Sequence, residues 1–223
     1  MEQDIQKDKK LYTTHVIDNR QIAPGVFVLS YPRVHHFKAG QCIGLTTDQE
    51  VSPRLYSIAS GEKEMVVQIL YNVKDDGWLT PRLSEVKAGN ELHVTAPQGI
   101  FCDNETPAWW IASGTGIAPF SSMFRSGLSQ NKTIIHGGRY RNSFYFEKEF
   151  KTGLKDAYIR CCSQESGPGI YPGRLTQYLK EIPELPSQYR YFLCGSPEMV
   201  VDVRDLLIAK GIAFENIVAE IYF

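Results

Sequence analysis

The strongest constraint on the fold is a change in the spacing of apolar segments near residues 103–107. Before this point, short strand-like runs alternate with turns, which is typical of a small antiparallel barrel. After it, strand-like and helical runs alternate, which favours a parallel sheet with helices on both faces. We therefore predict a tail over residues 1–10, a barrel domain over 11–103 and an α/β domain over 104–223.

The first part is expected to form a six-stranded antiparallel barrel. Its strands are predicted at Tyr12–Ile17, Val26–Ser30, Cys42–Leu45, Arg54–Ser60, Met65–Tyr71 and Glu91–Ala96. One helix is expected between the last two, with Thr80 as its N-cap. Pro81 then stands at the first helical position, where its missing N–H costs no hydrogen bond.

The second part is expected to form a Rossmann-like parallel sheet that binds a nucleotide. Its strands are predicted at Ala108–Ala112, Thr133–His136, Ala157–Cys162, Tyr191–Cys194 and Ile217–Tyr222. The helices between them are predicted at Pro119–Leu128, Phe144–Thr152, Leu175–Glu181 and Glu198–Lys210.

Composition excludes several classes of protein. The 223 residues are 43% hydrophobic and 22% charged, with a formal net charge of −1, so a nucleic-acid or anionic-membrane partner is not indicated. The five cysteines show no Cys-x-x-Cys spacing, and we predict no metal. The charged N-terminus and the lack of a long apolar run predict a cytoplasmic protein, and import into an organelle stays open. We expect a monomer.

The segment Arg54-Leu55-Tyr56-Ser57 carries the most chemical information. Alternate residues of a strand share a face, so Arg54 and Tyr56 would present a cation and an aromatic ring together. These groups suit a pyrophosphate and a planar cofactor, as in a flavin dinucleotide. Ser57 points to the other face unless the strand end is twisted or bulged. An ordinary barrel strand is the alternative.

Two glycine turns are candidate phosphate sites. Gly114-Thr115-Gly116 lies between a predicted strand and a helix, where glycines allow close backbone approach and the helix offers free N–H groups. Gly77-Trp78-Leu79-Thr80 precedes the short helix of the first part and would add the Thr80 hydroxyl as a donor. Either could instead be a tight turn without a ligand.

The last candidate groups lie near the end of the chain. Cys194 ends a predicted strand and Gly195 follows it before a helix, which is where α/β proteins bind ligands. The chain ends in Glu220-Ile221-Tyr222-Phe223, so an aromatic ring could pack on a planar ligand. A core cysteine and a simple terminal strand are the alternatives.

Taken in order, these motifs resemble the ferredoxin–NADP reductase superfamily over nearly the whole chain, from about residue 11. The matching segments are Phe37–Gln41, Arg54–Ser57, Gly77–Thr80, Gly114–Pro119, Cys194–Met199 and Glu220–Tyr222. The resemblance implies an FAD-binding barrel followed by an NADP-binding α/β domain. In many NADP-using relatives a Ser-Arg pair follows the third strand of the sheet, whereas this chain has Ser163-Gln164.

The resemblance also implies a role for individual residues. The residues expected to bind FAD are Arg54, Leu55, Tyr56, Ser57, Leu70, Gly77, Trp78, Leu79, Thr80, Thr115, Tyr222 and Phe223. Those expected to bind NADP are Gly114, Thr115, Gly116, Arg139, Ser163, Arg174, Cys194 and Gly195. Those expected at the hydride-transfer site are Ser57, Cys194, Glu220 and Tyr222.

The implied function is electron transfer between NADP(H) and a one-electron carrier, such as a small acidic ferredoxin or flavodoxin. One alternative with the same fold is an NAD(P)H reductase of a free flavin, a quinone or an oxygenase component. A non-catalytic flavin-binding relay subunit is another, although Cys194 and Glu220 argue against it.

Overall fold

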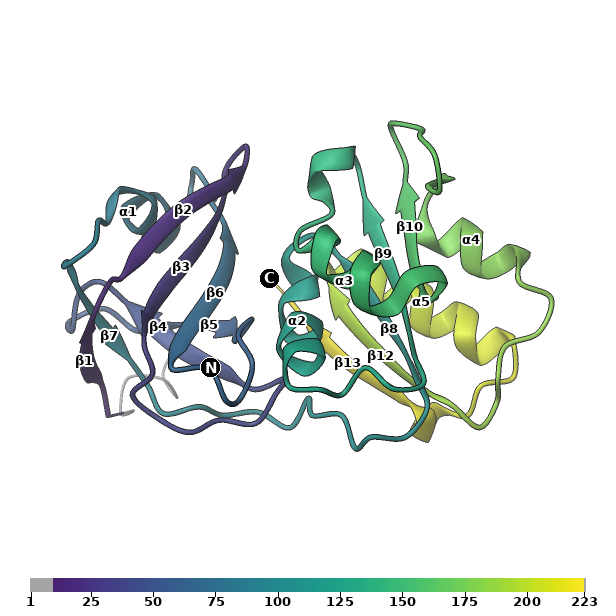
Figure 1. The fold of residues 1–223 in the computed structure, drawn as a ribbon, viewed down its shortest axis with the longest axis horizontal. Helices are drawn as coiled ribbons and strands as arrows, with labels where there is room; N and C mark the ends of the chain where they lie inside the picture. Colours follow the sequence, from purple (N-terminus) through teal and green to yellow (C-terminus); the bar gives the residue numbers. More distant parts are fainter. Residues whose placement is uncertain (1–9, 223) are drawn as a thin grey trace. The chain divides into compact units, whose positions relative to one another are not determined.

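The computed structural model describes residues 10–222, so Phe223 and nearly all of the predicted tail lie outside the described residues. The described residues form two units (Figure 1). The β unit runs as far as Cys102 and also includes Ser121–Ser126. The α/β unit contains Asp103–Phe120 and the residues from Gly127 onward.

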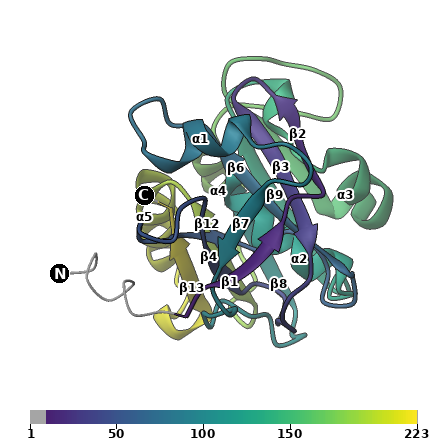
Figure 2. The ribbon, with the colours of Figure 1, turned by 90° about the vertical axis from the view of Figure 1, so that its left-hand side faces the viewer.

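The β unit contains two antiparallel sheets. One has the order β1-β7-β4-β5, with strands Tyr12–His15, Glu91–Val94, Cys42–Thr46 and Arg54–Ser57. The other has the order β2-β3-β6, with strands Asp18–Ala23, Val26–Pro32 and Val66–Asn72 (Figure 2). A single antiparallel bridge between Ile58 and Ile69 joins the sheets where the chain leaves β5.

The described part of the β unit has seven strands where six were expected, because β2 was missed. Its sequence, Asp-Asn-Arg-Gln-Ile-Ala, is mostly polar, and none of its side chains is fully buried. As an edge strand with a register shift between Gln21 and Ala23, it needs no apolar alternation to pair with β3. The antiparallel β class predicted for this part is confirmed.

The short helix α1 spans Leu79–Glu85, and its N-cap is Trp78, so the prediction that Thr80 caps it was wrong. The Thr80 side chain instead accepts a hydrogen bond from the backbone N–H of Lys74 at 2.8 Å. Leu79 and Leu83 are buried in the core of the unit. Apolar packing therefore sets where this helix begins.

The α/β unit contains a parallel sheet with the order β11-β10-β9-β8-β12-β13. In chain order its strands are β8 Ala108–Ser113, β9 Lys132–Gly138, β10 Tyr158–Cys162, β11 Tyr171–Pro172, β12 Arg190–Gly195 and β13 Ile217–Ile221. Five strands were expected, and the additional β11 has only two residues. The predicted Rossmann-like class is confirmed.

Helices pack on both faces of this sheet. Ile111, Ile135 and Leu193 share one apolar cluster with α4 (Leu175–Glu181) and α5 (Pro197–Ala209). On the opposite face, Trp110 stacks on Phe120 of α2 (Ala118–Arg125), with ring centroids 5.6 Å apart. Helix α3 (Glu147–Leu154) covers the same face through Phe150, which packs on Tyr158.

A buried ion pair holds the start of the α/β unit. Lys132 Nζ lies 2.8 Å from Asp103 Oδ1, and both side chains are fully buried. The other Asp103 oxygen accepts a hydrogen bond from Trp110 Nε1 at 2.8 Å, and Lys132 also donates to the carbonyl of Thr106. Each charge is thus paired and hydrogen-bonded, as a buried pair requires.

Among residues 10–222, no helix combines the length and the hydropathy needed to span a membrane. The same residues contain no group of three or more His, Cys, Asp or Glu side chains that could hold a metal ion.

Candidate functional site

The first half of the candidate site lies on β5. Arg54 and Leu55 are exposed, Tyr56 is half-buried and Ser57 is buried. The Tyr56 ring meets Tyr71 edge-on, with centroids 6.5 Å apart, and packs against the core of the β unit. Burial raises the pKa of Tyr56, so its hydroxyl stays neutral. The strand thus presents an exposed cation and a fixed ring.

Ser57 differs from its neighbours because its hydroxyl is buried without a partner. The residue is 3% exposed, and its Oγ has no hydrogen-bond partner among residues 10–222. Buried hydroxyls are almost always hydrogen-bonded in folded proteins. A ligand acceptor beside β5 would satisfy this group, which is the fit expected for a flavin ring nitrogen.

The strand ends earlier than predicted. It stops at Ser57 rather than Ser60, because Ala59 N donates to Gln68 O of β6 at 2.8 Å. The chain therefore changes its pairing partner at Ile58 and Ala59, so the strand ends irregularly just after Ser57. Ser57 needs such an irregular end if it is to face the same ligand as Tyr56.

The second predicted phosphate turn, Gly77–Thr80, is largely occupied by contacts within the protein. Gly77 N donates to Lys74 O at 2.8 Å, and the Thr80 hydroxyl is also engaged with Lys74. The Arg82 guanidinium lies over the Trp78 ring, with Cζ 4.4 Å from the ring centroid. The Leu79 side chain belongs to the core, and Leu70, in β6, is buried.

The second half of the candidate site lies at the carboxyl ends of β8 and β12. The strand order reverses between these neighbours, and open α/β sheets bind ligands at such a point. The glycine turn, Gly114–Ile117, follows β8, and Gly195 ends β12. The predicted nucleotide residues Gly114, Thr115 and Gly116 are therefore brought to the same edge of the sheet as Gly195.

Glycine is required at two of these positions. A Cβ on Gly116 would lie 2.3 Å from the carbonyl oxygen of Cys194, and a Cβ on Gly195 would lie 2.3 Å from Ser113 Oγ. Gly195 also has φ +150°. The two loops therefore touch through their backbones, and only glycine allows that approach.

Cys194, Glu220 and Tyr222 are brought together by the pairing of β12 with β13. Cys194 lies in register with Glu220, and Tyr222 N donates to Gly195 O at 3.0 Å. Burial raises the pKa of the Cys194 thiol well above its usual value, and the charge of Glu220 raises it further, while a hydrogen bond with Tyr222 lowers it. Cys194 is therefore a neutral thiol at physiological pH, not a nucleophilic thiolate.

Three residues predicted to bind a phosphate follow neighbouring strands or precede a helix. Arg139 follows β9, Ser163 follows β10, and Ser163 N donates to Gly138 O at 3.0 Å. Arg174 directly precedes α4. Both arginines are exposed, so their guanidinium groups are available to an anion.

Comparison with known proteins agrees with this geometry. The family described as the oxidoreductase NAD-binding domain matches residues 110–205. A flavodoxin/ferredoxin–NADP reductase from Escherichia coli (strain K12) is 28% identical over 194 residues, which are 75% of this chain and 77% of that protein. A toluate 1,2-dioxygenase electron transfer component from Pseudomonas putida is 25% identical over 220 residues, covering 92% of this chain and 66% of that protein.

A solved structure extends the likeness to the complete fold. The ferredoxin NADP⁺ reductase from Neisseria gonorrhoeae superposes with a TM-score of 0.88 at 21% identity, over 97% of this chain and all of that one. The chain is thus similar to ferredoxin–NADP reductases in sequence and in fold. The predicted resemblance to the ferredoxin–NADP reductase superfamily is thereby confirmed, whereas the role of each site residue stays a prediction.

Sequence reasoning missed two residues that lie near the predicted phosphate-binding residues in the chain, Arg141 and Glu165. Arg141 follows Arg139 by two positions, and its backbone N–H donates to Glu165 Oε2 at 2.6 Å. Glu165 therefore brings a carboxylate to the backbone of Arg141, two positions after the predicted Arg139. The only sequence signal was the Gln164-Glu165 pair, since the contact joins residues 24 positions apart.

Proposed function

We propose that the chain is an FAD-dependent oxidoreductase that transfers electrons between NADP(H) and a one-electron carrier such as ferredoxin or flavodoxin. The observation that carries the proposal is the buried Ser57 hydroxyl, which has no partner among residues 10–222 and lies on the same short strand as Arg54 and Tyr56. The Neisseria gonorrhoeae reductase has FAD and NADP bound, which supports the choice of cofactors.

In the flavin domain, proposed as residues 11–103, three residues of β5 have distinct tasks. The exposed Arg54 binds the pyrophosphate, and the Tyr56 ring packs on the isoalloxazine. Ser57 donates its unused hydrogen bond to the ring. FAD supplies the chemistry, since it accepts two electrons as hydride and can release them singly.

In the coenzyme domain, proposed as residues 104–223, the glycine turn lets the backbone approach the phosphates of the nucleotide. Arg139, Ser163 and Arg174 bind the 2′-phosphate, and their charge favours NADPH over NADH. Cys194 and Glu220 line the pocket of the nicotinamide. Tyr222 would be the residue that packs on the flavin ring when no nicotinamide is bound.

The identity of the acceptor separates two candidate functions. The likeness to the toluate 1,2-dioxygenase component favours, as a second candidate, a reductase that serves an oxygenase. We propose a small acidic carrier as the main partner and a cytoplasmic monomer as the working form.

The test begins with the purified protein. Heat release of its flavin followed by chromatography should yield FAD, and FMN or no flavin would reject the proposal. Steady-state reduction of ferredoxin, flavodoxin, free flavin, a quinone and an oxygenase component, with NADPH and with NADH, then identifies the acceptor. A protein that binds FAD and reduces none of them would be a relay subunit instead.

A further inference from the structure

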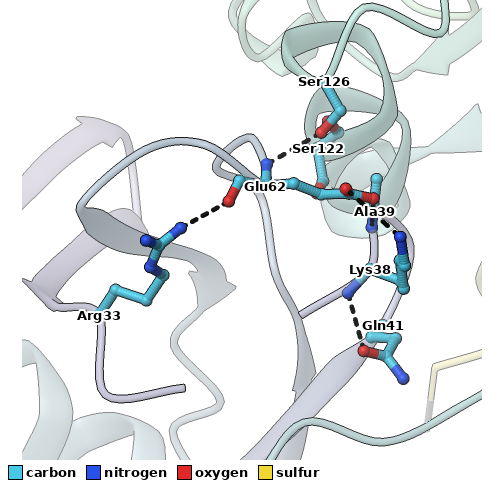
Figure 3. A network of polar contacts seen from close by, with 7 residues as sticks. All are labelled: Arg33, Lys38, Ala39, Gln41, Glu62, Ser122 and Ser126. Carbon is cyan, nitrogen blue, oxygen red and sulfur yellow. Dashed lines mark hydrogen bonds and ion pairs between the residues drawn. The ribbon is translucent and has the colours of Figure 1, made fainter. Parts of the chain in front are cut away.

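The loop Gly61–Glu64 connects β5 to β6, and most of its contacts converge on Glu62. The backbone N–H of Glu62 donates to Ser126 Oγ at 3.0 Å. Its carbonyl oxygen accepts a hydrogen bond from Arg33 Nη1 at 2.6 Å (Figure 3). The side chain makes further contacts of its own, so this one residue binds the chain through all of its polar groups.

The Glu62 carboxylate fastens a turn that precedes β4. Oε1 accepts a hydrogen bond from Ala39 N at 2.7 Å, and Oε2 lies 4.0 Å from Lys38 Nζ. The turn is closed internally by two hydrogen bonds: Gln41 N donates to Lys38 O at 3.0 Å, and Lys38 N donates to Gln41 Oε1 at 2.9 Å. Figure 3 shows these side chains around Glu62.

The same turn holds the end of the proposed flavin strand. Gln41 O accepts a hydrogen bond from Ile58 N at 3.0 Å, and Ile58 is the residue directly after Ser57. Ile58 is fully buried, so this bond cannot be exchanged for one with water without opening the core. Glu62 is therefore linked to the Ser57 backbone through a short chain of hydrogen bonds.

On its other side, Glu62 holds the carboxyl end of α2. Ser126, which accepts from Glu62 N, donates its own hydroxyl to Ser122 O at 2.7 Å. The neighbouring Gly61 approaches the helix so closely that a Cβ would lie 2.9 Å from Arg125 O. Helix α2 begins directly after the glycine turn, so the loop fixes the far end of the helix that this turn starts.

We propose that Glu62 is a positioning residue for the reductase reaction. It joins the end of β5, which carries Ser57, and the end of α2, which follows the glycine turn, into one hydrogen-bonded group. In this proposal Glu62 acts through these protein contacts and not on a cofactor. The proposal rests on the proposed function, because Ser57 and the glycine turn are the groups whose placement matters for hydride transfer.

The test compares three variants. Glu62→Ala removes the acceptor of Ala39 N, whereas Glu62→Gln keeps it and loses only an exposed ion pair of little worth. Glu64→Ala is the matched control, since Glu64 Oε1 also accepts a backbone hydrogen bond, from Gly61 N at 2.8 Å, but within the same loop. Stopped-flow reduction by saturating NADPH, the visible flavin spectrum and amide hydrogen exchange are measured for each.

We expect Glu62→Ala to retain FAD and to transfer hydride about 10- to 100-fold more slowly, the scale of an error of about 1 Å in position. Amide exchange should accelerate at Ala39 and Ile58, and the flavin band should shift. Glu62→Gln should restore the rate, and Glu64→Ala should match the wild type. A normal rate in Glu62→Ala, or an equal loss in Glu64→Ala, would overturn the proposal.

Ser126→Ala covers the case in which Glu62→Ala fails to fold. It removes only the hydroxyl that accepts from Glu62 N, and Ser126→Thr restores it. A slower rate that Thr rescues supports the proposal, and an unchanged rate in Ser126→Ala rejects it. If the wild-type protein holds no FAD or is not reduced by NADPH, the proposed function is rejected. If the wild type is active and the variants react at the same rate, only the role proposed for Glu62 is rejected.

Discussion

At the scale of single residues, the buried Ser57 hydroxyl leads to a prediction in two parts, which can be measured separately. In the protein freed of flavin its hydroxyl has no hydrogen-bond partner among the described residues, so Ser57→Ala should not lower the free energy of unfolding there. In the protein with FAD the same change should slow hydride transfer. Urea unfolding of the flavin-free protein and stopped-flow reduction of the loaded protein measure the two parts.

A destabilised flavin-free Ser57→Ala protein would mean that the hydroxyl has a partner within the chain. Hydride transfer at the wild-type rate would remove Ser57 from the site. Tyr56→Phe is a suitable control, because it keeps the ring that packs on Tyr71.

Coenzyme choice is also decided by single residues. Arg139→Ala and Arg174→Ala should lower kcat/KM for NADPH by about 10-fold or more and leave NADH nearly unchanged, since only NADPH carries the 2′-phosphate. Gln164→Arg should raise the preference for NADPH by adding a cation. Steady-state kinetics with both coenzymes measures the effect, and equal losses for NADPH and NADH would place the arginines elsewhere.

The residues that could be predicted from sequence share one property: each belongs to a local motif. Arg54 to Ser57 and the glycine turn are contiguous, so spacing, residue type and, for Ser57, the family resemblance were enough to propose them, and their roles stay predictions. The role proposed for Glu62 could not be predicted from sequence, because it depends on contacts with Arg33, Ala39 and Ser126. These residues are 29, 23 and 64 positions away in the chain.

At the scale of elements, the turn between β8 and α2 depends on Gly116. A side chain there would lie 2.3 Å from the Cys194 carbonyl, and neither backbone can give way easily. We expect Gly116→Ala to destabilise the protein by about 1–3 kcal/mol and to abolish tight coenzyme binding. Gly167→Ala is the control, since its Cβ would meet no atom nearer than 3.5 Å.

Thermal unfolding and NADP⁺ titration measure the two effects of Gly116→Ala. Unchanged stability together with unchanged binding would show that the turn can open without harm.

Strand β9 carries a buried histidine that should make stability depend on pH. His136 is fully buried, with Nδ1 3.0 Å from Tyr158 Oη, and burial lowers its pKa from 6.5 to about 3. The unfolded chain takes up a proton below pH 6.5 while the folded chain does not, so stability is present above that pH and falls as pH drops toward 3. The loss should reach about 2 kcal/mol at pH 5.

Urea unfolding at pH 7 and pH 5 measures this dependence on pH. His136→Phe should reduce it, and an identical slope in that variant would assign the dependence to other groups.

The helices and strands also show which elements can be predicted from apolar patterns in the sequence. Strands with apolar alternation were found, and α4 was predicted with the correct bounds. Strand β2 was missed because an edge strand can be polar, and β11 because two residues carry no pattern. Thr80 was misread because burial of Leu79 decided where α1 begins.

At the scale of the whole molecule, cofactor removal should lower stability by mass action. A ligand that binds only the folded state adds about 2.7 kcal/mol at 100 times its Kd. For a chain of this size that is roughly 5–10 °C in Tm. Scanning calorimetry of flavin-free protein with added FAD should show this rise, and FMN should give less; equal rises with FMN would contradict the dinucleotide assignment.

The buried pair of Asp103 and Lys132 has a consequence for anyone who separates the two halves of the gene. A fragment that starts at residue 104 discards the carboxylate and keeps the ammonium sealed beneath Trp110. Such an orphaned charge costs about 3–5 kcal/mol. A fragment that starts one codon upstream retains the Asp103 carboxylate. The practical boundary of the α/β half is therefore set by this ion pair rather than by where its strands begin.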